Sequence, residues 1–251
     1  MDMTDLVAEV EAAFTRSATG LERWDDPHPP PDRTVADDEY SRLTNPAKWR
    51  IIGARADAWI DALVGLGLAT VDRDAAPRWV EQPATAVTRM GLVTPSVGGG
   101  LSLVVCRSRI EDVPDAGVTL GVGDPAVRIA FIPDCGCDAC DSGSQDVIDH
   151  LDSYLRPIVT GEFRHLWRGR QSITVLDDGR RQARNIGMGE LPAGIRFSVA
   201  PSNRRFLDPG PAPRRRRRTR EVVDEILADP SGWNERSGPS WLAGPPGDMR
   251  H

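Results

Sequence analysis

Three apolar segments between residues 101 and 132 constrain the fold more than any other feature of the sequence. They are Leu101–Cys106, Gly117–Val122 and Val127–Ile132, and the clusters EDVPDAG and GDPA separate them. Apolar runs of this length, bounded by Pro, Gly and Asp, are typical of β-strands joined by turns. A further run, Thr85–Met90, precedes the turn Gly98–Gly100. We therefore predict an antiparallel meander in the middle of the chain.

Three segments around this meander have the spacing of amphipathic helices. Asp5–Phe14 carries apolar residues four positions apart, and Thr4 is its expected N-cap. Pro46–Leu66 begins with a proline, and Gly67 follows it as the expected C′ residue. Gln145–Val159 comes after the meander and gathers its apolar side chains on one face. We expect these helices to pack on the sheet.

The remaining part of the chain alternates strand and loop signals. Ser172–Ile186 contains an Asp-Gly turn between two strand-like runs and predicts a hairpin, and Gly194–Ala200 predicts one more strand. Leu207–Pro213 is rich in proline and predicts a linker, which a short amphipathic helix at Glu221–Ala228 follows. From Asp229 onward the sequence has no periodicity.

These elements predict an α+β protein: an antiparallel sheet packed with helices, a helical N-terminal part and a basic, partly disordered C-terminal extension. The expected organisation is one domain at residues 1–206, with a cysteine-rich loop at 134–144, followed by the linker, helix and tail of residues 207–251.

Composition narrows the class of protein. The net charge is −6, yet residues 204–220 hold eight Arg against one Asp, and Lys48 is the single lysine of the chain. No apolar run has the roughly 20 residues of a membrane helix. The first residues are acidic and do not resemble a signal peptide. We therefore expect a cytoplasmic protein whose thiols stay reduced.

The loop IPDCGCDACDSGS places three of the four cysteines within six residues. Cys135, Cys137 and Cys140 form the spacing C-x-C-x-x-C, and the intervening glycine lets the backbone turn sharply. Thiolates are preferred ligands of zinc, so this spacing predicts a zinc site with three ligands from one loop.

The fourth ligand must come from elsewhere. We expect Cys106, because its strand and Val127–Ile132 run in the same direction, so that Cys106 ends near the level of the loop. Asp134 or Asp141 could complete a mixed site, and His150 and His165 are further alternatives with less support.

Two other readings of the loop stay open. Cys137 and Cys140 form a C-x-x-C before a helix, as in thiol redox enzymes and sensors, although the neighbouring aspartates disfavour thiolate formation unless a cation is bound. Alternatively, the cysteines are small apolar residues of a buried turn.

A basic run is the second candidate site. It could bind an anionic partner or nucleic acid, because adjacent guanidinium groups create a dense positive field. No aromatic residue is interleaved for stacking on bases, and the run could equally be a charged linker or an arm that docks on the acidic N-terminal region. Its members are Arg214, Arg215, Arg216, Arg217, Arg218 and Arg220.

No catalytic residues are predicted. The acidic trio Asp37–Glu39 fits the first turn of a helix, and the glycine run Gly98–Gly100 lacks the rest of a phosphate-binding motif. The four histidines occur in unrelated contexts, so no Ser-His-Asp arrangement follows and no organic cofactor is expected.

The segment PDCGCDACDSGS, the downstream FRHL at Phe163–Leu166 and the upstream stretch Val35–Ala69 together resemble a family of actinobacterial proteins of unknown function. The resemblance covers roughly residues 20–200, and the cysteine loop is its most specific motif. It implies a shared architecture and a bacterial cytosolic setting. The sequence thus favours a non-enzymatic domain with a structural zinc ion and leaves enzymatic activity open.

Overall fold

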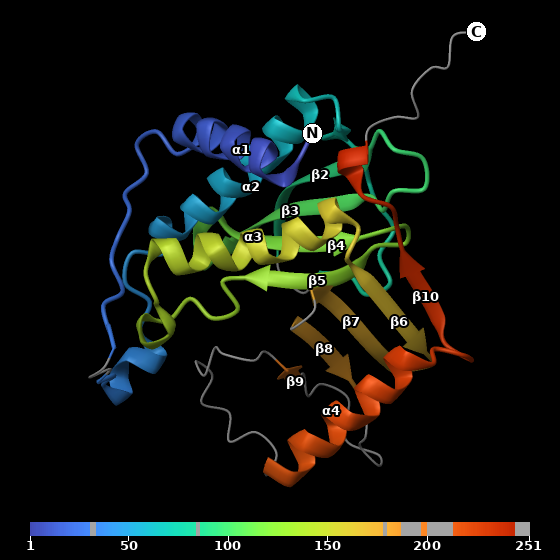
Figure 1. Ribbon diagram of the computed structural model, residues 1–251. Coiled ribbons are helices and arrows are strands. Elements are labelled where there is room, and N and C mark those ends of the chain that lie inside the picture. The colour runs from blue at the N-terminus through green and yellow to red at the C-terminus, as the bar shows by residue number, and fades with distance from the viewer. Residues whose placement is uncertain (31–33, 84–85, 178–179, 187–196, 200–212, 244–251) are drawn as a thin grey trace, which may run out of the picture. The chain divides into compact units, whose positions relative to one another are not determined.

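The computed structural model describes residues 1–30, 34–83, 86–177, 180–186, 197–199 and 213–243. It divides the chain into two compact units. Unit 1 comprises Met1–Thr160 and Pro239–His251, and unit 2 comprises Gly161–Gly238. Unit 1 contains an antiparallel sheet and several helices, and the described part of unit 2 contains an antiparallel sheet and the helix α4, so the expected α+β class is confirmed (Figure 1). The expected boundary after residue 206 stays a prediction, since residues 200–212 lie outside the described residues.

The sheet of unit 1 is an antiparallel meander with the order β1-β2-β3-β4-β5. The predicted strand Val127–Ile132 is β5, with the same bounds. Strands β2, β3 and β4 are longer than the sequence indicated, and β1 was not predicted. The bounds are Ala69–Asp72 for β1, Val87–Pro95 for β2, Leu103–Ile110 for β3 and Val113–Val122 for β4.

Strand β3 continues past Cys106 because Arg107 is buried in the structure, although its side chain is charged. Its guanidinium donates to the carbonyl oxygen of Gly53 and forms an ion pair with Asp57 at 2.7 Å. A paired guanidinium can be buried at a strand position where an unpaired one would be too costly. Apolar periodicity alone therefore predicts the end of this strand four residues too early.

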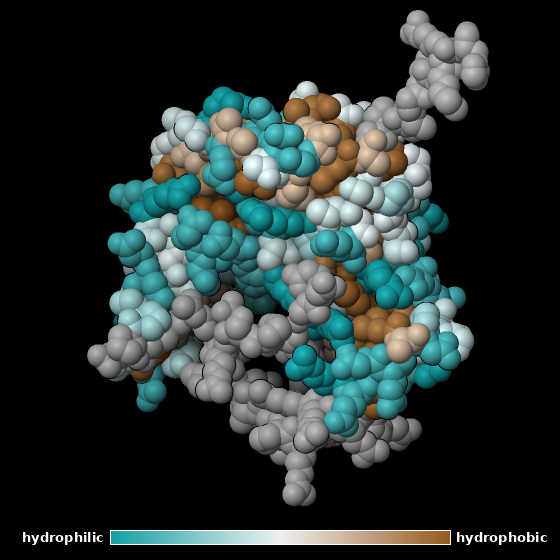
Figure 2. All heavy atoms as spheres, viewed as in Figure 1, coloured by the Kyte–Doolittle hydropathy of each residue, from teal (hydrophilic) through white to brown (hydrophobic). Residues whose placement is uncertain are grey.

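Three helices of unit 1 lie along one side of this sheet in Figure 1. They are α1 (Met3–Ser17), α2 (Arg50–Gly65) and α3 (Ser144–Thr160). Helix α2 packs against α1, α3 and β4, and it is therefore buried on most of its surface. The outward side of α3 is hydrophilic, in agreement with its amphipathic sequence (Figure 2).

The helix ends differ in detail from the expected ones. Asp2, not Thr4, caps α1, and it forms a capping box with Asp5. The segment Pro46–Trp49 is a separate 3₁₀ helix, η2, that precedes α2. Gly67 is confirmed as the C′ residue of α2, with a φ of +70° and the two backbone hydrogen bonds of a Schellman motif.

A buried ion pair joins the helices of unit 1. Arg55 of α2 donates to both carboxylate oxygens of Asp152 on α3, at 2.9 and 2.6 Å. The same carboxylate accepts the indole N–H of Trp59 at 2.7 Å, and Arg55 also donates to Glu11 of α1. Because both charges are paired and hydrogen-bonded, the pair fixes the register of the three helices within the core.

Unit 2 contains a sheet of order β10-β6-β7-β8-β9 and the helix α4. The predicted hairpin is present as β7 and β8, and its Asp-Gly turn lies outside the described residues. Val223 of α4 packs with Leu166 and Ile173 of the sheet in the core of the unit. The bounds are Arg164–Arg168 for β6, Gln171–Asp177 for β7, Arg180–Arg184 for β8, Phe197–Val199 for β9, Pro213–Ala228 for α4 and Asn234–Ser237 for β10.

The C-terminal extension has more regular structure than its sequence indicates. Helix α4 begins at Pro213 and not at Glu221, so the arginine run lies in its first turns. Strand β10 pairs with β6, where Arg164 forms two hydrogen bonds with Glu235. In unit 1 the short helix η4 (Trp241–Ala243) buries the Trp241 side chain. Short segments stabilised by partners distant in sequence carry no periodicity of their own.

Membrane insertion is not indicated by any described helix, since none combines the length and the apolar character that a membrane span requires.

Candidate metal centre

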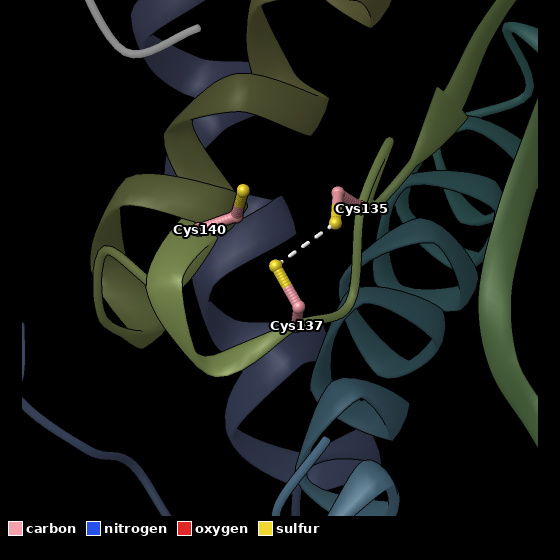
Figure 3. A group of neighbouring side chains, drawn as sticks. All are labelled: Cys135, Cys137 and Cys140. Carbon is pink, nitrogen blue, oxygen red and sulfur yellow. Dashed lines mark hydrogen bonds between the residues drawn. The ribbon is translucent and has the colours of Figure 1, made fainter. Parts of the chain in front are cut away.

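The structure brings together the sulfurs of Cys135, Cys137 and Cys140, which all lie within 4.8 Å of one another. Cys135 Sγ and Cys137 Sγ are 3.1 Å apart, and Figure 3 shows these two side chains pointing toward each other with Cys140 beside them. All three cysteines are free and half-buried. The predicted C-x-C-x-x-C cluster therefore has the compact geometry that a metal ion requires.

A short 3₁₀ helix, η3 (Asp138–Cys140), creates this geometry. Cys137 is its N-cap, and the backbone N–H of Cys140 donates to the carbonyl oxygen of Cys137 at 3.0 Å. Residues three positions apart in a 3₁₀ turn lie on the same side. Cys137 and Cys140 thus face one space, and Cys135 reaches it from the chain that leaves β5.

Asp138 anchors the loop to the segment before η2. Its carboxylate accepts hydrogen bonds from Arg42 Nε at 2.7 Å and from the backbone N–H and hydroxyl of Thr44 at 2.8 and 2.7 Å. Burial raises the pKa of this carboxyl, but the hydrogen bonds from Arg42 and Thr44 outweigh burial and lower the pKa to about 2. Asp138 is therefore ionised and fully engaged at neutral pH.

Asp141 anchors the other end of the loop and is 2 % exposed. It forms an ion pair with Lys48 and accepts the indole N–H of Trp24 at 2.8 Å. The backbone N–H of Gly143 also donates to it, at 3.0 Å. The Lys48 ammonium lies near the faces of two indole rings, that of Trp24 and that of Trp49, at 5.4 and 5.1 Å. The negative charge of Asp141 is thus balanced by Lys48, which holds this end of the loop.

Gly136 lies between two of the cysteines and allows close packing of the loop. A Cβ atom at this position would be 3.4 Å from Leu43, 3.7 Å from Trp49 Nε1 and 3.8 Å from Ile110. Trp49 is 1 % exposed, and its indole N–H has no hydrogen-bond partner. A buried donor without a partner is unfavourable by about 1–3 kcal/mol. This donor lies beside Gly136, in the loop that carries the cysteines.

The free thiols are poor nucleophiles in this environment. Burial raises the pKa of Cys140 to about 12, and the neighbouring cysteines add to the shift. Burial also raises the pKa of Cys135. Without a bound cation, Cys140 is therefore protonated at neutral pH. A metal ion would displace these protons and stabilise the thiolates.

Cys106 is placed in a different environment. It is fully buried in the middle of β3, in a cluster with Val104 and Ala126, and Trp79 packs against this cluster. Burial raises its pKa to about 11. Cys106 pairs with Thr119 of β4, which pairs with Phe131 of β5, so Cys106 lies at the expected level, near the end of β5. Two strand spacings, roughly 10 Å at about 4.8 Å each, separate β3 from β5. The role of Cys106 as a fourth ligand stays a prediction and would require it to leave this cluster.

The other proposed ligands have their own surroundings. Asp134 is exposed, and the ring of His150 stacks on Tyr154 with the ring centroids 5.3 Å apart. His165 belongs to unit 2, where its Nδ1 lies 2.9 Å from the Thr174 hydroxyl. Burial, together with Arg236 and Arg184, lowers the pKa of His165 to about 4. The structure thus brings together only the three loop cysteines of the predicted set.

Sequence reasoning missed Arg42, Lys48 and Trp49 as supports of the loop. They lie nearly one hundred residues before it, and single charged or aromatic residues carry no pattern that marks such a pairing. The one available signal was compositional, since Lys48 is the only lysine in an arginine-rich chain. The arginine run Arg214–Arg218 lies in α4, and its side chains are outside the described residues.

The fold and the cluster define an α+β protein with a three-cysteine group that could hold a metal ion. Residues 10–241 match the family of unknown function DUF6226, and the chain belongs to this family. Neither a curated protein nor a solved structure matches the chain. The expected membership of a family without assigned activity is confirmed, whereas its actinobacterial origin and the cysteine loop as its marker stay predictions.

Proposed function

We propose that this protein binds one zinc ion through Cys135, Cys137 and Cys140, and that the ion stabilises the loop between β5 and α3. The observation that carries the proposal is the approach of all three sulfurs to within 4.8 Å of one another. Zn–S bonds of about 2.3 Å place the sulfurs of a tetrahedral site roughly 3.8 Å apart. Small side-chain rotations of the loop cysteines reach this spacing.

The charges around the loop support a cation with thiolate ligands. Three thiolates and a Zn²⁺ ion carry a net charge of about −1. Asp138 and Asp141 would add unfavourable negative charge if they were unpaired, but Arg42 and Lys48 are bound to them. The aspartates therefore serve as supports that hold the loop, and the sulfurs remain available to the metal.

The proposed role is structural and not catalytic. The loop contacts η1 (Asp37–Ser41) through η3, and it joins the last strand of the sheet to α3. A metal ion in this loop would connect these elements, and its binding free energy would add to the stability of unit 1.

Two alternatives have less support. A thiol redox enzyme or sensor that uses Cys137 and Cys140 needs an activated thiolate, whereas burial raises the pKa of Cys140 to about 12. An anionic partner, including nucleic acid, could bind the arginine run. The composition of unit 2 favours this second activity, since it contains 16 Arg and 10 Asp or Glu.

Thermal unfolding with and without a chelator tests the zinc proposal. Removal of zinc is expected to lower the melting temperature of the full chain by at least about 5 °C, and added zinc restores it. Cys135→Ser should unfold at the temperature of the metal-free protein and be insensitive to the chelator. Cys106→Ala is the matched control, and its melting temperature should still fall on chelation. A wild-type melting temperature that changes with neither chelator nor added zinc would refute the proposal.

A further inference from the structure

We infer that the metal centre is open: the fourth coordination position is taken by a small thiol from solution, bound as its thiolate. This inference rests on the proposed zinc site and names the class of ligand that the site would accept. The binding step is an exchange without oxidation. The thiol sulfur replaces a metal-bound water molecule and forms a metal–sulfur bond, and the thiol proton passes to solvent.

The described part of the chain supplies three ligands to this centre. Among the described residues, no further Cys, His, Asp or Glu offers an atom within the group formed by the three sulfurs. The chain has four cysteines, and the remaining one, Cys106, is packed in the apolar cluster of β3. A zinc ion with three protein ligands keeps one position for an exogenous ligand.

Two carboxylates of the loop are held by other groups. Asp138 is held by Arg42 and Thr44, and Asp141 is held by Lys48 and Trp24. Their release would break two ion pairs and several hydrogen bonds, and in the case of Asp141 it would leave Lys48 without its partner in a mostly buried position. Neither is therefore a favourable fourth ligand.

The character of the three protein ligands favours a thiol. The cysteines are half-buried and so keep some exposure to solvent. Gly136, between two of them, is bordered by the apolar side chains of Leu43 and Ile110 and by the Trp49 indole. An alkyl thiolate suits a centre that already has three thiolates, because zinc prefers soft sulfur ligands and forms sites with four of them. A carboxylate would suit this centre less well.

Cobalt substitution tests the inference on the full chain, purified with a phosphine in place of a thiol reductant. The sulfur-to-cobalt charge-transfer absorption reports the number of bound thiolates. Titration with 2-mercaptoethanol should raise it by about one third and saturate, because a fourth thiolate joins three. Acetate at equal concentration should leave it unchanged.

Variants separate the possible outcomes. Cys106→Ala and Asp134→Asn should retain the full response to the thiol.

Failure of the inference and failure of the proposed function are distinguishable. Cobalt that binds but does not respond to 2-mercaptoethanol would overturn the open centre while leaving the metal site intact. Loss of charge-transfer intensity in Cys106→Ala before thiol is added would overturn it as well, because Cys106 would then be the fourth ligand. A response to the thiol that appears only in Asp134→Asn would overturn it too, because Asp134 would then occupy the fourth position. A chain that binds neither cobalt nor zinc would overturn both.

Discussion

Arg42 and Asp138 are joined by two reciprocal hydrogen bonds. The Arg42 guanidinium donates to the Asp138 carboxylate at 2.7 Å, and the Asp138 backbone N–H donates to the Arg42 carbonyl oxygen at 2.8 Å. Residues 96 positions apart thus form one rigid connection between the cysteine loop and the segment before η2. The loop is held in place by its acidic residues, while its cysteines face one another.

Loss of this connection should weaken metal binding more than stability. The Arg42 side chain is 50 % exposed, so the ion pair itself contributes less than about 1 kcal/mol to folding. Supports of this kind nevertheless change metal affinity by about tenfold or more. We expect Arg42→Gln to lower zinc affinity about tenfold in competition with a chromophoric chelator. Arg78→Gln, which removes an exposed ion pair with Asp124 away from the loop, should leave zinc affinity unchanged. Equal zinc affinities of Arg42→Gln and wild type would contradict the role of Arg42 as a support of the loop.

Asp138 should make stability depend on pH in the acid range. Its folded-state pKa of about 2 is below the unfolded value of about 3.9, so the folded state favours the ionised form. The resulting stability is present above about pH 4 and is lost as the pH falls toward 2. Asp138→Asn should therefore be less stable than wild type in urea at pH 6, and the difference should shrink between pH 4 and 2. A difference that is constant over this interval would be inconsistent with the lowered pKa.

Asp152 should be the most sensitive charged position of the core. Asp152→Ala removes the buried partner of Arg55, leaves only the exposed carboxylate of Glu11 to pair with it, and removes the acceptor of the Trp59 indole. Broken buried pairs of this type destabilise proteins by about 3–5 kcal/mol. Asp149→Ala, at an exposed position of the same helix, should change stability by less than about 0.5 kcal/mol. Chemical denaturation of the two variants measures this contrast, and similar values would argue against a buried pair.

Gly143 connects the end of the loop to the N-terminal segment. It has a φ of +85°, and a Cβ atom would lie 2.7 Å from the backbone nitrogen of Asp26. Gly143→Ala should therefore destabilise the protein by about 2–3 kcal/mol through strain and overlap. Gly20→Ala is the control, because Gly20 has a φ of +80° and open space around it. This variant should lower the free energy of unfolding by only about 1 kcal/mol. Equal losses would mean that the N-terminal segment moves aside.

The sequence predicted those parts of the fold that have a local signal. Val127–Ile132 is an apolar run that begins directly after a turn cluster, and the structure has β5 with the same bounds. Gly67 ends α2 because only a residue that tolerates positive φ fits there. The clustering of Cys135, Cys137 and Cys140 also follows from local spacing, since a single short turn aligns residues three positions apart.

The parts that sequence reasoning missed depend on distant partners. Strand β3 extends through Arg107 because Asp57 of α2 compensates the buried charge. This extension places Cys106 in mid-strand and not at the strand end that had been expected. The supports Arg42, Lys48 and Trp49 meet the loop only in the folded chain. No single-sequence pattern reports such pairings, which are therefore visible only in the structure.

Elemental analysis of the purified full chain, together with a count of reactive thiols, tests the central claim most directly. The account predicts about one zinc ion per chain, with Cys135, Cys137 and Cys140 protected from alkylation until zinc is removed. Cys106 should stay unreactive in both states because it is buried in β3. A protein without metal in which Cys137 and Cys140 alkylate rapidly would contradict the zinc site and favour the redox alternative.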